Sequence, residues 1–333
     1  MTFSRTQWVR FVGIAALLAT IAAIAIGHPL AVAAPLTGAE PSATAGLSAP
    51  PEMNWFEAFI LGMVQGLTEF IPISSTAHLK VVPVLLGWGD PGVSFSAVIQ
   101  LGSIAAVLWY FRQDLGDLSN GALRAVIRRE YDDPDFRIVL GIILGTIPIA
   151  CVGLLLKASA SQFYEQTLRS LTAIAIVSIV MSALLALAER IGRRKRHFGQ
   201  LELADGVLMG LAQTMALIPG VSRSGSTITA GLYLGLDRAS AARFSFLLGI
   251  PAITLAGVVE LKDLLAEIAS GSLQGGLLPL GVGLLSSTVF SYAAISWLIQ
   301  FLQKRSTFVF VWYRLAFGVA LLAIVFSGVE FAH

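Results

Sequence analysis

Two short polar stretches interrupt an otherwise apolar chain, and the first is VQGLTEFIPISSTAH at residues 64–78. Gln65 and Glu69 have the i, i+4 spacing that puts two side chains on one face of a helix, and Pro72 would end or kink that helix. The hydroxyl residues and His78 that follow then lie in or beside non-helical backbone. A carboxylate, several hydroxyls and an imidazole in one place are groups that general-base and nucleophilic catalysis use.

Each of these residues also has a structural interpretation. Glu69 could belong to a structural ion pair, and His78 could be a buried histidine whose hydrogen bonds are satisfied by its neighbours. Hydroxyl side chains after a proline commonly cap a helix, and this alternative applies to Ser74, Ser75 and Thr76. An ionisable side chain inside a membrane is functional by default. The cluster as a whole therefore favours a site.

The second stretch, PGVSRSGST at residues 219–227, supplies a cation. Arg223 is flanked by hydroxyl residues, which are Ser222, Ser224, Ser226 and Thr227. Glycine in such a stretch lets backbone N–H groups converge on an anion, and a guanidinium presents planar, bidentate donors to phosphate. The alternative is that Arg223 only pairs with Glu69 and neutralises it. Phosphate binding is compatible with that pairing.

The composition indicates that these stretches belong to an integral membrane protein. Of 333 residues, 56% are hydrophobic and 13% are charged, and the mean hydropathy is +0.80, whereas soluble domains carry about 25% charged residues. The net charge of +2 is too small and too scattered to indicate nucleic-acid binding. Six apolar runs are near the ~20 residues that cross a bilayer. These predicted spanning helices cover 93–111, 137–157, 169–189, 243–261, 277–301 and 308–331.

The first 54 residues form a separate segment. Arg5 and Arg10 precede an apolar run at 11–26, and Ala31-x-Ala33 follows, which is typical of a secretory signal peptide. An uncleaved N-terminal anchor fits equally well. In either case residues 28–54 are expected to be a flexible linker, and the membrane domain is predicted to be 55–333.

The basic residues of the loops predict the orientation, because cytoplasmic loops are rich in Lys and Arg. Basic clusters follow the predicted helices 93–111, 169–189 and 277–301, and Arg238 and Arg243 mark the start of helix 243–261. The connections 158–168 and 262–276 are poor in basic residues. Segments 55–92 and 203–236 therefore each enter and leave the membrane on one side. Such re-entrant backbone needs protein or a wet cavity around it, which suits a polar site.

The two predicted re-entrant hairpins resemble each other. GMVQGLTEFIPISST (62–76) and GLAQTMALIPGVSRSGST (210–227) share an initial glycine, a glutamine and an Ile-Pro pair. Each hairpin is followed by three predicted spans of opposite orientation. This pattern predicts an all-α fold with an inverted-topology repeat, whose two halves are about 55–189 and 203–331.

QGLTEFIPISSTAH and PGVSRSGST also resemble the two signature motifs of the undecaprenyl-pyrophosphate phosphatase family, also known for bacitracin resistance. Those motifs are (E/Q)-x-x-x-E and P-G-x-S-R-S-x-x-T, and the resemblance extends from about Trp55 to Phe331. It implies a fold of two inverted repeats. It also implies removal of the terminal phosphate from a C55 polyprenyl diphosphate, which recycles the lipid carrier of cell-wall synthesis. The partners would then be this lipid and the bilayer of the bacterial plasma (inner) membrane.

The resemblance also assigns residues. The catalytic group would be Glu69, Ser75, His78 and Arg223, and the diphosphate site would be lined by Gln65, Ser74, Thr76, Ser222, Ser224 and Thr227. The family's site opens to the outer face and uses a divalent cation, Mg²⁺ or Ca²⁺, for which Glu69 is the expected ligand. Gln65 stands where a glutamate is frequent in the family, so this helix has one carboxylate fewer.

Two questions stay open at the level of the sequence. Ser75 could attack phosphorus, with Glu69 or His78 accepting its proton, and form a phosphoserine, or water could attack a metal-bound diphosphate directly. The alternative function is a secondary transporter or flippase of an anionic lipid or small anion, because transporters also use inverted repeats and broken helices at the midplane.

Overall fold

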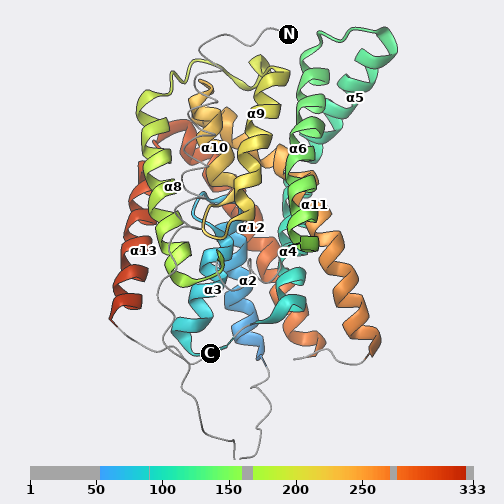
Figure 1. Cartoon of the computed structure of the whole chain (residues 1–333). Helices are drawn as coiled ribbons and strands as arrows, with labels where there is room; N and C mark the ends of the chain where they lie inside the picture. The colour runs from blue at the N-terminus through green and yellow to red at the C-terminus, as the bar shows by residue number, and fades with distance from the viewer. Residues whose placement is uncertain (1–52, 90, 160–167, 271–275, 328–333) are drawn as a thin grey trace, which may run out of the picture. The chain divides into compact units, whose positions relative to one another are not determined.

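Helices joined by short connections make up the computed structural model, which describes residues 53–89, 91–159, 168–270 and 276–327 (Figure 1). No strand occurs among these residues. The signal peptide or anchor predicted within 1–54 lies almost wholly outside them. The α-helices are α2 (Trp55–Phe70), α3 (Ser75–Leu86), α4 (Gly92–Tyr110), α5 (Arg112–Arg128), α6 (Pro134–Ser159), α8 (Leu171–Ile191), α9 (Leu203–Gln213), α10 (Arg223–Tyr233), α11 (Arg238–Ser270), α12 (Leu277–Lys304) and α13 (Phe308–Phe326). Two short 3₁₀ helices are η2 (Phe198–Gln200) and η3 (Thr214–Leu217).

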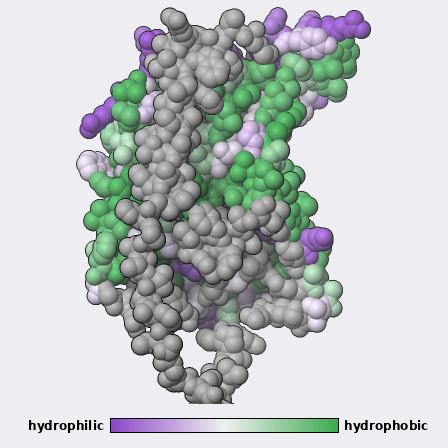
Figure 2. Space-filling view, in the orientation of Figure 1, coloured by the Kyte–Doolittle hydropathy of each residue, from purple (hydrophilic) through white to green (hydrophobic). Residues whose placement is uncertain are grey.

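The described helices confirm the all-α membrane class. Five of them, α6, α8, α11, α12 and α13, are long and apolar enough to cross a membrane, and the pair formed by α4 and α5, bent by 65°, is a sixth candidate. Hydrophobic residues cover most of the visible described surface, and hydrophilic residues gather mainly near its upper edge (Figure 2). The protein is therefore an integral membrane protein with several apolar helices.

Helix α5 was not predicted from the sequence, which indicated only a basic loop between the first two spans. Leu118, Ala122 and Ala125 follow i, i+4, i+7 spacing and are buried, whereas Leu123 and Ile127 are exposed. The prediction of a loop was wrong because the segment is polar on average. Only the helical spacing of its apolar residues indicates that it is a helix.

The two predicted hairpins are pairs of short helices that pack against each other, α2 with α3 and α9 with α10. In Figure 1 the first pair lies in the lower half of the molecule and the second in the upper half. The residue directly before the second helix of each pair is a serine with left-handed backbone: Ser74 has φ 78° and Ser222 has φ 70°. Serine rarely adopts this conformation. The same backbone at matching places supports the proposed repeat.

Close backbone approach holds the hairpins in the bundle. Helix α2 packs along α12, and a Cβ added at Gly62 would lie 2.5 Å from the carbonyl oxygen of Gly283. Helix α9 packs along α6, and a Cβ at Gly210 would clash with the backbone of Gly145. Small residues let membrane helices approach this closely. The first helix of each hairpin thus packs on a helix of the other predicted half, a reciprocal arrangement that two interlocked repeats would produce.

Candidate active site

Glu69, in the last turn of α2, is the centre of the polar cluster. Its Oε2 accepts hydrogen bonds from Ser75 Oγ at 2.8 Å and from Gln65 Nε2 at 3.2 Å. Its Oε1 lies 3.2 Å from Nη2 of Arg223, and both of these charged side chains are only 8% exposed. Both carboxylate oxygens of Glu69 therefore have donors, and the two hairpins meet at this residue.

The local backbone explains why Ser75 faces Glu69. Helix α2 ends at Phe70, and a tight turn with a hydrogen bond from Ile73 N to Ile71 O, 2.7 Å, reverses the chain around Pro72. Ser75 is then the first residue of α3. Its hydroxyl donates to the Glu69 carboxylate, whereas Ser74, the N-cap residue, makes no side-chain capping hydrogen bond.

Gln65 is held from the neighbouring helix α4. Its Nε2 donates to Gln100 Oε1 at 2.7 Å and to Ser103 Oγ at 3.4 Å, in addition to Glu69. This places Gln65 where it orients the carboxylate without adding a second negative charge. Gln65 of the first motif is therefore in direct contact with the Glu69 carboxylate.

Arg223 is the first residue of α10, and its guanidinium is almost fully buried. Besides Glu69 it donates from Nη1 to the carbonyl of Ser245 at 3.4 Å, and it lies 5.8 Å from the ring centre of Phe70. A Cβ added at Gly249 would clash with this guanidinium, so the glycine of α11 leaves the space that Arg223 occupies. Sequence reasoning missed Gly249, since one glycine in a long apolar run carries no distinctive signal.

The hydroxyl residues of the second motif mostly bind protein groups. Ser222 Oγ accepts from Gly225 N at 3.1 Å and thereby caps α10. Ser224 Oγ donates to the carbonyl of Ile71 at 3.3 Å, which joins the second hairpin to the first. The hydroxyls of Thr227 and Ser245 are 2.6 Å apart. Their predicted part in binding a diphosphate stays a prediction.

The two ring nitrogens of His78 contact groups other than Glu69. Its Nδ1 lies 2.7 Å from the carbonyl oxygen of Ser74, and its Nε2 lies 2.6 Å from the hydroxyl of Tyr313. Thr76, the remaining predicted residue, is exposed and shares a 3.1 Å contact with the Ser74 hydroxyl. The structure thus brings together Gln65, Glu69, Ser75 and Arg223, and it places His78 beside them in a second polar contact.

Arg314 of α13 is a residue that sequence reasoning missed. It is fully buried, and it donates to the carbonyls of Pro72 at 3.1 Å, Val221 at 3.0 Å and Gly220 at 2.7 Å. These carbonyls belong to the breaks of both hairpins, so one guanidinium fastens the two turns that carry the site. The sequence signal for it was a single arginine inside the predicted span 308–331, because charged side chains inside a membrane usually have a functional or pairing role.

Glu69 and the neighbouring oxygen and amide groups fit a hard divalent cation in part. Among the described residues no group of three or more His, Cys, Asp or Glu side chains gathers as a ready-made metal site. Mg²⁺ is commonly held by one or two carboxylates together with substrate phosphates and water. Glu69 together with the oxygens of a diphosphate would be such a donor set.

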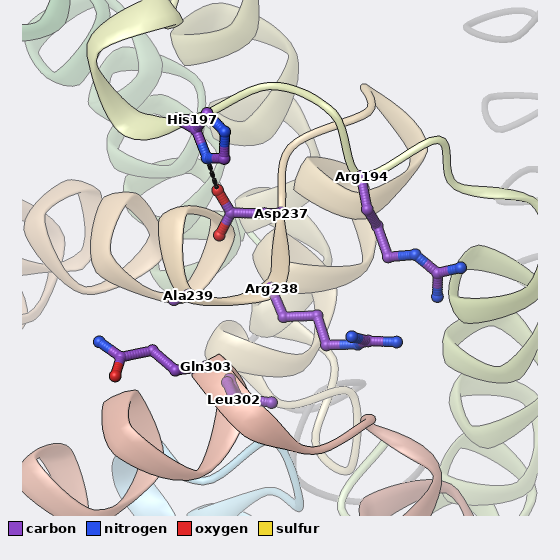
Figure 3. A pocket seen from close by; sticks show the side chains of 7 residues that line it. All are labelled: Arg194, His197, Asp237, Arg238, Ala239, Leu302 and Gln303. Atoms are coloured by element: carbon purple, nitrogen blue, oxygen red, sulfur yellow. Dashed lines mark hydrogen bonds and ion pairs between the residues drawn. The ribbon is translucent and has the colours of Figure 1, made fainter.

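A cavity of about 340 Å³ lies elsewhere, between the connection after α8 and the start of α11 (Figure 3). Its lining residues are Arg194, His197, Asp237, Arg238, Ala239, Leu302 and Gln303. Both of its arginines bind Glu189, Arg194 Nη1 at 2.7 Å and Arg238 Nε at 2.9 Å. Asp237 in turn holds His197, with 2.8 Å between Oδ2 and Nδ1. These pairs within the chain join the end of α8 and the connection after it to the start of α11. No predicted site residue lines the cavity.

Comparison with known proteins agrees with the motifs. The family model described as bacitracin resistance protein BacA matches residues 58–320. A protein of Trichormus variabilis described as undecaprenyl-diphosphatase is 56% identical over 329 residues, which cover 99% of this chain and 99% of that protein. One of Synechocystis sp. with the same description is 58% identical over 299 residues, 90% of this chain and 91% of that protein. The chain therefore belongs to the bacitracin resistance protein BacA family.

Proposed function

We propose that this chain is an undecaprenyl-diphosphatase, which removes the terminal phosphate of a C55 polyprenyl diphosphate and so regenerates the monophosphate lipid carrier of cell-wall synthesis. The relatives that carry this description align with the chain over nearly their whole length. Bacitracin resistance is the association of the family. The observation that carries the proposal is the Ser75–Glu69–Arg223 contact, with 2.8 Å and 3.2 Å between the bonded atoms.

The contact supports a covalent route. Ser75 Oγ attacks the terminal phosphorus while Glu69 takes the hydroxyl proton, which it already receives as a hydrogen bond at 2.8 Å. The bond between phosphorus and the bridging oxygen breaks, and the polyprenyl monophosphate leaves with the proton, which Glu69 gives to its new terminal oxygen. Glu69, ionised again, then takes a proton from the water that attacks the phosphoserine. The bond between phosphorus and Ser75 Oγ breaks, inorganic phosphate leaves, and Glu69 returns the proton to the serine.

Arg223 and Gln65 supply the positive charge and the hydrogen-bond donors around Glu69 in these two reaction steps. Phosphoryl transfer spreads negative charge over the equatorial oxygens, so fixed positive charge and hydrogen-bond donors contribute most of the catalysis. Arg223 pairs with the buried Glu69 and presents its remaining donors to the phosphate. A divalent cation held by Glu69 and the diphosphate oxygens would supply further charge neutralisation when bound.

The proposed location is the bacterial plasma membrane, with the site open to the outer face. The dense basic cluster at 190–196 and the basic residues Lys304 and Arg305 support a cytoplasmic position for the ends of α8 and α12. The hairpin α2–α3 would then enter from the outer side, where the diphosphate lipid would reach Ser75.

The test is phosphate release from C55 diphosphate by the purified full chain in detergent. No gradient exists there, so release distinguishes hydrolysis from a transporter or flippase. The wild type should release phosphate, and Glu69→Gln should be at least about 100-fold slower. Glu57→Gln is the matched control, because Glu57 lies on the same helix, at its other end, is only half-buried, and glutamine preserves its N-terminal capping role. No release by the wild type would contradict the proposed function.

A further inference from the structure

Tyr313 makes the closest hydrogen-bond contact to the His78 side chain, and no signature motif contains it. The tyrosine lies on α13, directly before Arg314, and its hydroxyl oxygen is 2.6 Å from His78 Nε2. The imidazole also stacks on Phe317, with ring centres 4.6 Å apart, and on Tyr313 itself at 5.7 Å. Helix α13 therefore holds the histidine both by its ring face and by one nitrogen.

The partners of the two ring nitrogens decide where the proton of neutral His78 lies. Nδ1 is 2.7 Å from the Ser74 carbonyl oxygen, which can only accept a hydrogen bond. Nδ1 must therefore carry the proton, and Nε2 must be the acceptor. A tyrosine hydroxyl can donate to it, so Tyr313 and Ser74 together favour one tautomer.

This tautomer affects the position of Ser75, the proposed nucleophile, through the backbone. Ser74 has φ 78°, a conformation that a serine keeps only when its surroundings enforce it. The Nδ1–H of His78 holds the Ser74 carbonyl, which is the peptide group immediately before Ser75. An imidazole that is rotated, or that carries its proton on Nε2 in place of Nδ1, would lose this hydrogen bond. The Ser74 carbonyl would then keep only the longer bond from the His78 backbone N–H, 3.3 Å, and the start of α3 could shift. Ser75 would then lose its alignment with Glu69.

We propose that Tyr313 is a positioning residue for the phosphatase reaction, which acts through His78 by holding the imidazole as the Nδ1–H tautomer and thereby fixing the Ser74–Ser75 backbone. The inference rests on the proposed function for its effect on turnover. Its structural half, the tautomer, is independent of that function.

The kinetic test is a double-mutant cycle on C55 diphosphate. Tyr313→Phe keeps the ring stack and should lower kcat by about 10-fold, with KM within about twofold, because one hydrogen bond to a buried acceptor is lost. In a His78→Ala background the same substitution should change kcat by less than about twofold. Tyr292→Phe is the control, since Tyr292 is 41% exposed and Tyr313 44%, and Tyr292 lies on α12 in contact with Tyr110. The proposal would be overturned if the kcat losses of the two single variants multiplied in the double variant, or if Tyr313→Phe left kcat unchanged.

The second readout is nitrogen NMR of the full chain labelled with ¹⁵N-histidine, with the His78 signals assigned by their loss in His78→Ala. The wild type should show a protonated Nδ1 and an unprotonated, hydrogen-bonded Nε2, and Tyr313→Phe should shift the Nε2 signal or mix the tautomers. An Nε2–H tautomer in the wild type, or identical spectra in both proteins, would overturn the proposal. This measurement needs no turnover, so an inactive wild type would contradict the proposed function and leave the tautomer decided.

Discussion

Glu69 and Arg223 are 154 positions apart in the chain, yet Oε1 of the first lies 3.2 Å from Nη2 of the second. One belongs to α2 and the other to α10, so each hairpin contributes one charge to a buried pair. Breaking such a pair leaves the remaining charge uncompensated. The same contact therefore joins the two hairpins and prepares the site.

Arg223→Ala should reduce kcat/KM by about 100-fold or more, because it removes a stabiliser of transition-state charge. Arg223→Lys should also be strongly impaired, since a compact ammonium does not replace the planar fork that spans Glu69 and Ser245. The measurement is phosphate release, with elution on size-exclusion chromatography as the check on folding. Arg128→Ala, at an exposed position of α5, is the matched control. A folded Arg223→Ala variant with wild-type turnover would remove Arg223 from the mechanism.

Ser75→Ala should lower kcat by several orders of magnitude with little change in lipid binding, because the lost group acts in the transition state. Ser74→Ala should cost far less, since the Ser74 hydroxyl contacts only Thr76 among the described residues. Trapping of a phosphoenzyme at low pH should succeed in the wild type and fail in Ser75→Ala. Equal, modest losses in both variants without trapped phosphate would favour attack by water with Glu69 as base.

Arg314→Met should destabilise the protein strongly, because three buried carbonyls of the two hairpin turns would lose their donor. Each unsatisfied buried group costs ~1–3 kcal/mol. The melting temperature in detergent should therefore fall well below that of the wild type, and activity should fall with it. Arg124→Met, which changes an exposed arginine of α5, should leave both unchanged. A wild-type melting temperature in Arg314→Met would contradict the fastening role.

Asp237 should make the region around α11 sensitive to acid. Partial burial raises the pKa of its carboxyl, but hydrogen bonds from Ser240 and His197 outweigh that effect and hold the pKa below its usual range. A pKa lowered by folding stabilises the protein above the unfolded value, about 3.9, and this contribution is lost as the pH falls through the folded pKa. The wild type should melt above Asp237→Asn at pH 7, and the gap should close as the pH falls below about 4. A gap that does not depend on pH would refute this account.

Cysteine labelling tests the orientation. In a Cys151→Ser background, Leu86→Cys at the end of α3 should react with an impermeant thiol reagent added outside whole cells, whereas Gly199→Cys should react only after permeabilisation. Leu86 is exposed, and a Cβ at Gly199 would meet nothing within 4 Å, so both positions accept the change. The expectation follows from the basic cluster at 190–196 beside Gly199. The reverse labelling pattern would invert the proposed topology.

The sequence by itself determined the all-α membrane class and indicated the residues that we propose carry the chemistry. Apolar runs of spanning length are a local property, and each of the six predicted runs overlaps a helix of the structure, although the first continues past a 65° bend into α5. Residues 328–331 of the last predicted run lie outside the described residues. The i, i+4 spacing of Gln65 and Glu69 is also local, and these side chains do touch at 3.2 Å. The two motifs pointed to the family because their order and spacing are specific.

Only the tertiary structure decided how these groups pair. Ser75 faces Glu69 and His78 faces Tyr313, although the sequence allowed either Glu69 or His78 as the partner of the serine. The sequence did not show what Arg314 and Gly249 contact, because their partners lie in turns and helices far along the chain. Spacing within one helix follows from its 3.6-residue period, whereas contacts between helices depend on how their surfaces pack, which no single segment encodes.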